Sequence, residues 1–166
     1  MAEFNSAENL NMNLAENFST DVMTGGLDER MFLYFRLSGS MKKADGVDII
    51  VSFLMESGVK MILKDLDQAL QRGAKIRILT GNYLGITQPS ALYLIKRKLG
   101  DQVDLRFYND PKRSFHPKAY MFHYATYSEM YIGSSNVSRS ALTSGIEWNY
   151  RFNSKTDPES YQKFYE

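Results

Sequence analysis

The sequence contains no cysteine and only two histidines among its 166 residues. Without cysteine the chain can form neither a disulfide framework nor a thiolate metal site, and it has no thiol nucleophile. Two histidines also nearly exclude a multi-histidine metal centre. No apolar run reaches the length of a membrane-spanning helix, so we expect no membrane partner. The first 25 residues have neither a basic start nor an apolar stretch, which predicts no secretory signal and a cytoplasmic protein.

An excess of charge of one sign is missing as well. Twenty basic residues balance 19 acidic ones and leave a net charge of +1. Such a chain has no overall field that attracts a polyanion, so any nucleic-acid binding must come from a local patch. Hydrophobic residues make up 43% and charged residues 23%, as in ordinary globular proteins. This composition excludes a disordered chain, a collagen-like repeat and a coiled coil.

The hydrophobic pattern divides the chain into two parts. Residues 1–26 are polar and predict a flexible N-terminal arm, or one that orders only against a neighbour. From residue 27 onward apolar residues recur at helical and strand spacings, which predicts one domain over 27–166. Because the last predicted helix is cut short by the end of the sequence, we expect this domain to be a fragment of a longer protein.

Strand and helix patterns alternate along the domain and predict an α/β fold. A strand at 47–54, a helix at 59–70 and a strand at 75–80 form a βαβ unit with parallel strands. The loop 81–85 follows this unit, at the edge where open α/β sheets usually bind ligands. The other predicted elements are helices at 27–41, 89–99, 138–143 and 158–166, and strands at 103–108, 117–124, 129–132 and 146–152.

A histidine and a lysine two residues apart, His116 and Lys118, form the first chemical motif. In an extended chain their side chains point to the same side, about 7 Å apart. The ammonium can neutralise the oxygens of a phosphoryl group while the imidazole attacks phosphorus or transfers a proton. An isolated pair of this kind is more often a solvated strand face, so the motif alone does not define a site.

Two further segments supply groups that suit an anion. Gly133, Ser134, Ser135 and Asn136 end a strand and open a helix, where hydroxyls, an amide and free backbone N–H groups are available. Glu147 can accept a hydrogen bond from an imidazole nitrogen, fix its tautomer and stabilise the imidazolium. Each segment alone has a plainer explanation, a helix cap for the first and a glutamate in a strand for the second.

Basic and aromatic residues near the motifs are candidates for holding a nucleic acid. The basic residues Lys112, Arg113 and Arg139 lie close to the motifs in sequence and could contact a phosphate backbone. The aromatic residues that could stack on bases are Tyr83, Tyr120 and Trp148. Solvated charge and core packing remain the more common explanations for such residues.

Together the three segments resemble the signature of the phospholipase D superfamily, H-x-K-x4-D followed by G-[SG]-x-N. His116 and Lys118 match its first part, and residues 133–136 match its second. Glu147 falls where single-motif nucleases of the superfamily carry an acid that orients the histidine. The segments HPKAYMF, IGSSNVSRSAL and GIEWN are similar to phospholipase D-like domains at the N-terminus of bacterial helicase and restriction-type proteins. The resemblance implies a mixed β-sheet flanked by helices.

The chain departs from the family pattern in two places. His123 stands where the motif has an aspartate. Strand alternation turns His123 away from His116 and Lys118, so we expect it to replace a structural group, not a catalytic one. The spacing from His116 to Gly133 also exceeds the pattern by a few residues, and we expect a longer hairpin around 125–128 to absorb them.

The resemblance also implies a mechanism. Family members use two such motifs in one active site, so a chain with one motif implies a homodimer with its site on the two-fold axis. One copy of His116 would form a phosphohistidine, and the other would protonate the leaving oxygen. Lys118 and Asn136 would hold the phosphate oxygens, with Ser134 assisting and Glu147 orienting the imidazole. The mechanism requires no metal or cofactor.

The implied function is a metal-independent phosphodiesterase, with single- or double-stranded DNA as its substrate and helicase domains fused to it. The candidate substrate-binding residues are Gly133, Ser135, Lys112, Arg113 and Arg139. Two alternatives stay open: a catalytically silent DNA-binding or dimerisation module of a helicase, and a lipid or nucleotide phosphodiesterase. The lack of an apolar interfacial helix favours DNA over a lipid.

Overall fold

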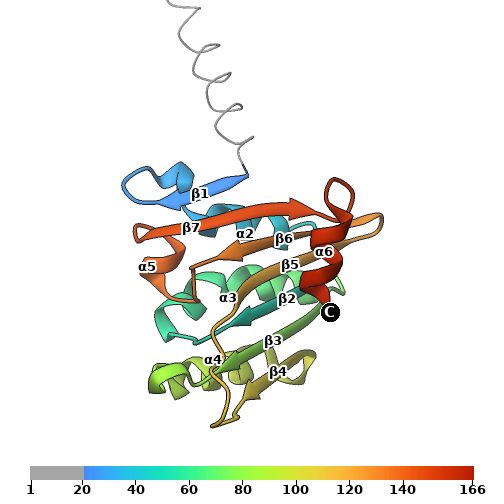
Figure 1. The fold of residues 1–166 in the computed structure, drawn as a ribbon. Coiled ribbons are helices and arrows are strands. Elements are labelled where there is room, and N and C mark those ends of the chain that lie inside the picture. Colours follow the sequence, from blue (N-terminus) through green and yellow to red (C-terminus); the bar gives the residue numbers. More distant parts are fainter. Residues whose placement is uncertain (1–20) are drawn as a thin grey trace, which may run out of the picture.

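The computed structural model describes residues 21–166, which form a single mixed β-sheet with helices packed on it (Figure 1). The strand order is β1-β7-β6-β5-β2-β3-β4. This arrangement confirms the predicted α/β fold with a mixed sheet flanked by helices. Most of the predicted N-terminal arm, residues 1–20, lies outside the described residues.

The observed elements follow the predicted ones closely. The strands are β1 (Val22–Gly25), β2 (Gly46–Val51), β3 (Lys75–Gly81), β4 (Val103–Tyr108), β5 (Lys118–Tyr124), β6 (Tyr127–Gly133) and β7 (Ile146–Asn153). The helices are α2 (Leu33–Met41), α3 (Glu56–Gln71), α4 (Pro89–Leu99), α5 (Arg139–Leu142) and α6 (Pro158–Tyr165), with 3-10 turns η1 (Glu29–Met31), η2 (Tyr83–Gly85) and η3 (Gly100–Gln102). In the described part of the chain, no helix combines the length and apolarity needed to cross a membrane.

Strand direction decides where the motifs meet. β2, β3 and β4 run parallel, whereas β5, β6 and β7 alternate in direction beginning with β5 antiparallel to β2. The ends of β2, β3, β4 and β6 therefore lie at the same edge of the sheet as the starts of β5 and β7 (Figure 1). We call this the motif edge, because all three predicted motif segments reach it.

The two faces of the sheet are covered unequally. α2, α3 and α4 pack on one face, and the main core lies beneath them with Val47, Ile49 and Phe122 fully buried. The other face carries α6 over a small cluster that includes Phe152 and Tyr161 (Figure 1). We call this second side the open face, because α6 covers only part of it.

Two sequence predictions are wrong in this region. Val22–Gly25, assigned to the arm, form strand β1 against β7, and Met23 is buried. Four residues are too few to show a periodicity, so the pattern could not reveal this strand. The hairpin between β5 and β6 is not long either, because Tyr124 pairs directly with Tyr127. The additional residues between His116 and Gly133 therefore lie in strands β5 and β6, because only residues 125–126 connect the two strands.

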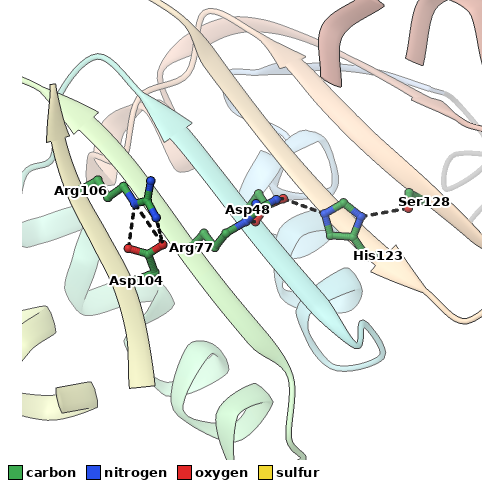
Figure 2. A network of polar contacts seen from close by, with 6 residues as sticks. All are labelled: Asp48, Arg77, Asp104, Arg106, His123 and Ser128. Atoms are coloured by element: carbon green, nitrogen blue, oxygen red, sulfur yellow. Dashed lines mark hydrogen bonds and ion pairs between the residues drawn. The ribbon is translucent and has the colours of Figure 1, made fainter. Parts of the chain in front are cut away.

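A chain of polar contacts crosses the open face (Figure 2). Asp48 on β2 accepts hydrogen bonds from Arg77, with Nε–Oδ1 at 2.6 Å, and its Oδ2 lies 2.7 Å from His123 Nε2. The other ring nitrogen of His123 lies 3.0 Å from the Ser128 hydroxyl. These contacts confirm that His123 faces away from Lys118 and fills a structural position.

The electrostatics of this network favour a carboxylate at position 48. Burial alone would raise the pKa of Asp48, but hydrogen bonds and charge from Arg77 and His123 outweigh burial and hold the pKa below its usual value. Asp48 is therefore ionised at neutral pH. A second carboxylate at position 123 would repel it across the two paired strands.

We expect His123→Asp to be less stable than His123→Asn by about 1 to 2 kcal/mol at pH 7, because Asp brings a second negative charge beside Asp48, whereas the neutral Asn of similar size can donate a hydrogen bond to it. Urea unfolding measures the difference. Adding Asp48→Asn to both variants should remove the gap, since the repelling partner is then neutral. Equal stability of His123→Asp and His123→Asn would show that Asp48 does not act on position 123.

Candidate active site

The motif edge brings the three predicted segments together. β5 begins at Lys118, β6 ends at Gly133 and β7 begins at Ile146. The pairing of Gly133 with Asn149, and of Ala119 with Ile132, places these strand ends side by side. The backbone itself therefore assembles the candidate site.

His116 and Lys118 are in direct contact. Lys118 Nζ lies 2.8 Å from His116 Nε2 and also donates a hydrogen bond to the His116 carbonyl oxygen at 3.0 Å. The predicted shared side is thus confirmed, at a shorter distance than two extended side chains would give, because His116 lies in the loop before β5. The imidazole is exposed, whereas Lys118 is 8% exposed. The pair offers a cation and a ring nitrogen to one anionic group.

The protonation of this pair suits a nucleophile. Partial desolvation by neighbouring groups lowers the pKa of His116 although its ring is largely exposed, and the Lys118 charge lowers it further. Burial also lowers the pKa of Lys118, against an opposing effect from the Glu147 carboxylate. His116 is therefore biased towards the neutral imidazole, whose Nε2 lone pair accepts a hydrogen bond from Lys118 here and can attack phosphorus once Lys118 turns to the phosphate oxygens.

Asn136 is held in place by the backbone of the β2–α3 loop. Its Oδ1 accepts a hydrogen bond from the Phe53 N–H at 3.2 Å, and the residue is buried. Because the oxygen is engaged, the NH₂ group is the end that can donate to a bound phosphate. Its surroundings therefore fit the predicted donor role.

Ser135 does not occupy a substrate-binding position, and this prediction is wrong. The residue has 0% exposure. Its hydroxyl donates to the Ala141 carbonyl at 3.1 Å and accepts from Asn149 Nδ2 at 2.9 Å. Tyr120 donates to the Ser135 carbonyl at 3.1 Å and is itself buried, so Tyr120 cannot stack on a base. Through these hydrogen bonds, both residues hold the loop between β6 and α5 against the core.

Glu147 contacts Ser134, not the imidazole. The Ser134 hydroxyl donates a hydrogen bond to the Glu147 carboxylate and accepts one from the Trp148 N–H at 3.0 Å. Since the Glu147 charge acts on the pKa of Lys118, the carboxylate belongs to the same cluster. The expected bond from Glu147 to His116 does not occur among residues 21–166.

Aromatic rings surround the loop that carries His116. The rings of Tyr83 and His116 have centroids 4.3 Å apart, a contact that sequence reasoning missed. Phe115 stacks on Tyr108 at 4.7 Å. The signal for Tyr83 was its position in the loop after β3, at the ligand-binding edge of the parallel strands.

The basic candidates divide into two groups. Lys112 and Arg113 are exposed and line a cavity of about 370 Å³ together with Tyr83. Arg139 begins α5, where its backbone N–H donates to the Ser57 hydroxyl at 3.3 Å. Lys112 and Arg113 therefore share a cavity with Tyr83, whose ring contacts His116.

Metal binding has no obvious donor set in this part of the molecule. Within residues 21–166 no three or more histidine, cysteine, aspartate or glutamate side chains gather in a way that could hold a metal ion. The titratable groups that the motifs bring together are instead His116, Lys118 and Glu147.

Comparisons with known proteins agree with this architecture. Residues 38–166 match the family model described as cardiolipin synthase, PLD-like domain. The fold is similar to that of Nuc from Salmonella typhimurium, a phospholipase D family member, with a TM-score of 0.57 and 19% identity over 78% of this chain and 82% of that one. NucT from Helicobacter pylori gives a TM-score of 0.56 at 16% identity, over 79% and 82%. Polyphosphate kinase from Porphyromonas gingivalis gives 0.55 at 15%, over 79% and 23%. Among curated proteins no match was found.

The two histidines allow a direct test of the site's electrostatics by NMR titration. We expect His116 to titrate below the usual pKa of 6.5. Lys118→Met should raise that pKa, because it removes a positive charge that disfavours the imidazolium. His116→Ala assigns the His116 signals and separates them from those of His123 at the opposite end of β5. An unchanged or lowered His116 pKa in Lys118→Met would contradict the described coupling.

Proposed function

This chain belongs to the family of phospholipase D-like domains, and on that premise we propose that it is a metal-independent phosphodiesterase that acts on DNA as an endonuclease. The observation that carries the proposal is the contact of Lys118 with the His116 imidazole, 2.8 Å apart at the motif edge. Asn136 is held at the same edge by Phe53, two residues after Val51, which pairs with Lys118. An imidazole nucleophile, a cation and an amide donor are the groups needed to transfer a phosphoryl group without a metal ion.

The chemistry has two steps. Lys118 turns from His116 Nε2 to the phosphate oxygens, Nε2 attacks phosphorus, a P–N bond forms, and the P–O bond to the leaving oxygen breaks. His116 of a second copy, in its protonated imidazolium form, gives a proton to that oxygen and becomes neutral. Water then attacks phosphorus, its proton passes to the second histidine, and the P–N bond breaks. Lys118 and Asn136 stabilise the charge on the nonbridging oxygens throughout.

Ser134 and Glu147 support the pair in this mechanism. Glu147 lies close enough to Lys118 to influence its pKa, and it holds the Ser134 hydroxyl. The carboxylate favours the charged form of Lys118 and so maintains the cation that binds phosphate. Glu147 thus acts first on the lysine, and any contact with an imidazole would involve the second copy.

A homodimer supplies the second histidine. Ile146, Trp148 and Tyr150 on β7 are 85%, 75% and 50% exposed, next to the candidate site. A largely apolar cavity of about 880 Å³, lined in part by Trp148 and Tyr150, continues to His116 and Lys118. Large exposed apolar patches of this kind mark interaction surfaces. A second copy seated here would cover the patch and bring its own His116 to the first.

A DNA substrate is supported by the exposed basic residues beside the site. Lys112 and Arg113 lie on the loop that leads to His116, where they can contact backbone phosphates on either side of the cleaved bond. Local cations are required, because the net charge of +1 provides no general attraction. We place the domain within a larger cytoplasmic helicase or restriction-type protein, which would deliver the DNA.

A second candidate function is a lipid phosphodiesterase. The observation that favours it is the apolar cavity beside His116, which offers room for an acyl chain if no second copy fills it. A silent binding module has weaker support. His123 lies in a polar network on the open face, so its departure from the family motif gives little support to a silent module.

Cleavage in the presence of excess EDTA tests the proposed function. We expect the wild type to cleave single- or double-stranded oligonucleotides, and His116→Ala to lose activity by about 10³-fold or more, because the nucleophile is removed. The matched control is His123→Asn, which alters the other histidine and should keep most activity. Circular dichroism confirms that each variant is folded.

The same assay separates the alternatives. Phosphatidylcholine vesicles and bis(p-nitrophenyl) phosphate are supplied beside the oligonucleotides. Cleavage of phosphatidylcholine but not DNA would replace the endonuclease with the lipid phosphodiesterase. Cleavage of none of them, with DNA binding intact in His116→Ala, would contradict an enzymatic role.

Trp148→Asp tests the shared site. We expect this variant to be monomeric by light scattering and to lose at least about 10-fold in activity, because a charge in the centre of the apolar patch opposes burial. Tyr93→Asp is the matched control, since Tyr93 is 74% exposed on α4, away from the patch. A fully active Trp148→Asp monomer would contradict a site shared between two copies.

A further inference from the structure

We propose that Tyr83 is a positioning residue that fixes the plane of the His116 imidazole for attack on phosphorus. The inference rests on the proposed function of His116 as the nucleophile. It assigns to the loop after β3 a role in the reaction that no motif of the sequence indicates.

His116 has few contacts that could hold its ring. The residue lies in the loop before β5 and its side chain is exposed. Lys118 Nζ contacts Nε2 at 2.8 Å and so fixes one nitrogen, but a single hydrogen bond leaves the ring free to rotate about that direction. The second contact is the Tyr83 ring, with centroids 4.3 Å apart and planes inclined by 50°. Because the Tyr83 ring packs against the imidazole, it restricts this rotation.

Glu147 does not perform this task within the chain. Its carboxylate is occupied by the Ser134 hydroxyl, and the structure gives it no bond to the His116 imidazole. A histidine nucleophile still needs a fixed orientation, because small errors in the attack direction reduce the rate strongly. Tyr83 is the group placed to supply this orientation.

The loop that carries Tyr83 forms a tight turn closed by its own backbone hydrogen bonds. The Gly85 N–H donates to the Asn82 carbonyl, and the Ile86 N–H to the Tyr83 carbonyl, both at 3.1 Å. Leu84 between them has a φ of +52°, a backbone conformation that residues other than glycine rarely adopt. Such strain persists only where the surroundings impose it, and it is concentrated at functional sites. The Leu84 side chain points into solvent and is 78% exposed.

The loop that carries His116 is anchored to the same strands. Phe115 stacks on Tyr108 at the end of β4, with centroids 4.7 Å apart. Phe115 also packs against Gly81 at the end of β3, where an added Cβ would lie 2.9 Å from the Phe115 ring. The loops that carry Tyr83 and His116 are therefore both attached to the ends of β3 and β4. This shared attachment keeps the two rings close together.

The test compares Tyr83→Leu, which removes the ring, with Tyr83→Phe, which keeps it. For oligonucleotide cleavage we expect Tyr83→Leu to lower kcat by about 10-fold or more, with KM changed less than about 2-fold, because orientation and not binding is lost. Tyr83→Phe should retain the wild-type kcat within about 2-fold. Tyr93→Leu, on exposed Tyr93 of α4, is the matched control and should behave as wild type.

NMR of the histidine ring protons supplies a readout that needs no activity. The His116 ring protons lie near the Tyr83 ring current, so their signals should move in Tyr83→Leu and stay nearly unchanged in Tyr83→Phe. The His123 signals should stay fixed in both variants. If the wild type cleaves no substrate, the proposed function fails on its own, and these signals still decide whether Tyr83 holds the imidazole.

Two results would overturn the proposal. The first is unchanged His116 signals in Tyr83→Leu, which would show that the ring contact does not exist in solution. The second is a higher KM with an unchanged kcat, which would show that Tyr83 binds substrate and does not orient the nucleophile.

Discussion

The antiparallel pairing of β5 with β2 is the constraint on which the site depends. Val51, the last residue of β2, lies opposite Lys118, the first residue of β5. This register places His116 just beyond the ends of the parallel strands, where the loop after β3 can reach it. If β5 shifted by one residue, Lys118 and His123 would exchange faces, because side chains alternate along a strand. The polar network and the candidate site therefore require the same register.

The two faces of the sheet have different roles. The helix-covered face holds the main core and, at the motif edge, the lysine and asparagine of the candidate site. The open face holds the Asp48, Arg77 and His123 network, which links β2, β3 and β5 through polar contacts (Figure 2). The exposed apolar side chains of β7 lie beside the candidate site. This separation allows a partner to approach the site without disturbing the core.

Periodicity and local chemistry predicted much of the fold and part of the candidate site. Strand alternation was enough to predict that His123 faces away from Lys118. Residues an odd number of positions apart on a strand lie on opposite faces. Ser135 was misplaced because a motif does not show which of its polar residues is used by the core. The Glu147 contact and the Tyr83 ring depend on loop conformations and on segments distant in sequence, which periodicity does not describe. Strand β1 was missed because a short edge strand gains its stability from its partner, not from its own pattern.

The measurement that tests the account most directly is the capture of the covalent intermediate. DNA is mixed with the protein, the reaction is stopped with denaturant at alkaline pH, where phosphohistidine survives, and the protein is analysed by intact and peptide mass spectrometry. The account predicts a nucleotide adduct on the peptide that contains His116, lost on acid treatment. DNA cleavage with an adduct on another residue such as Ser134, or with none under rapid quenching, would contradict His116 as the nucleophile.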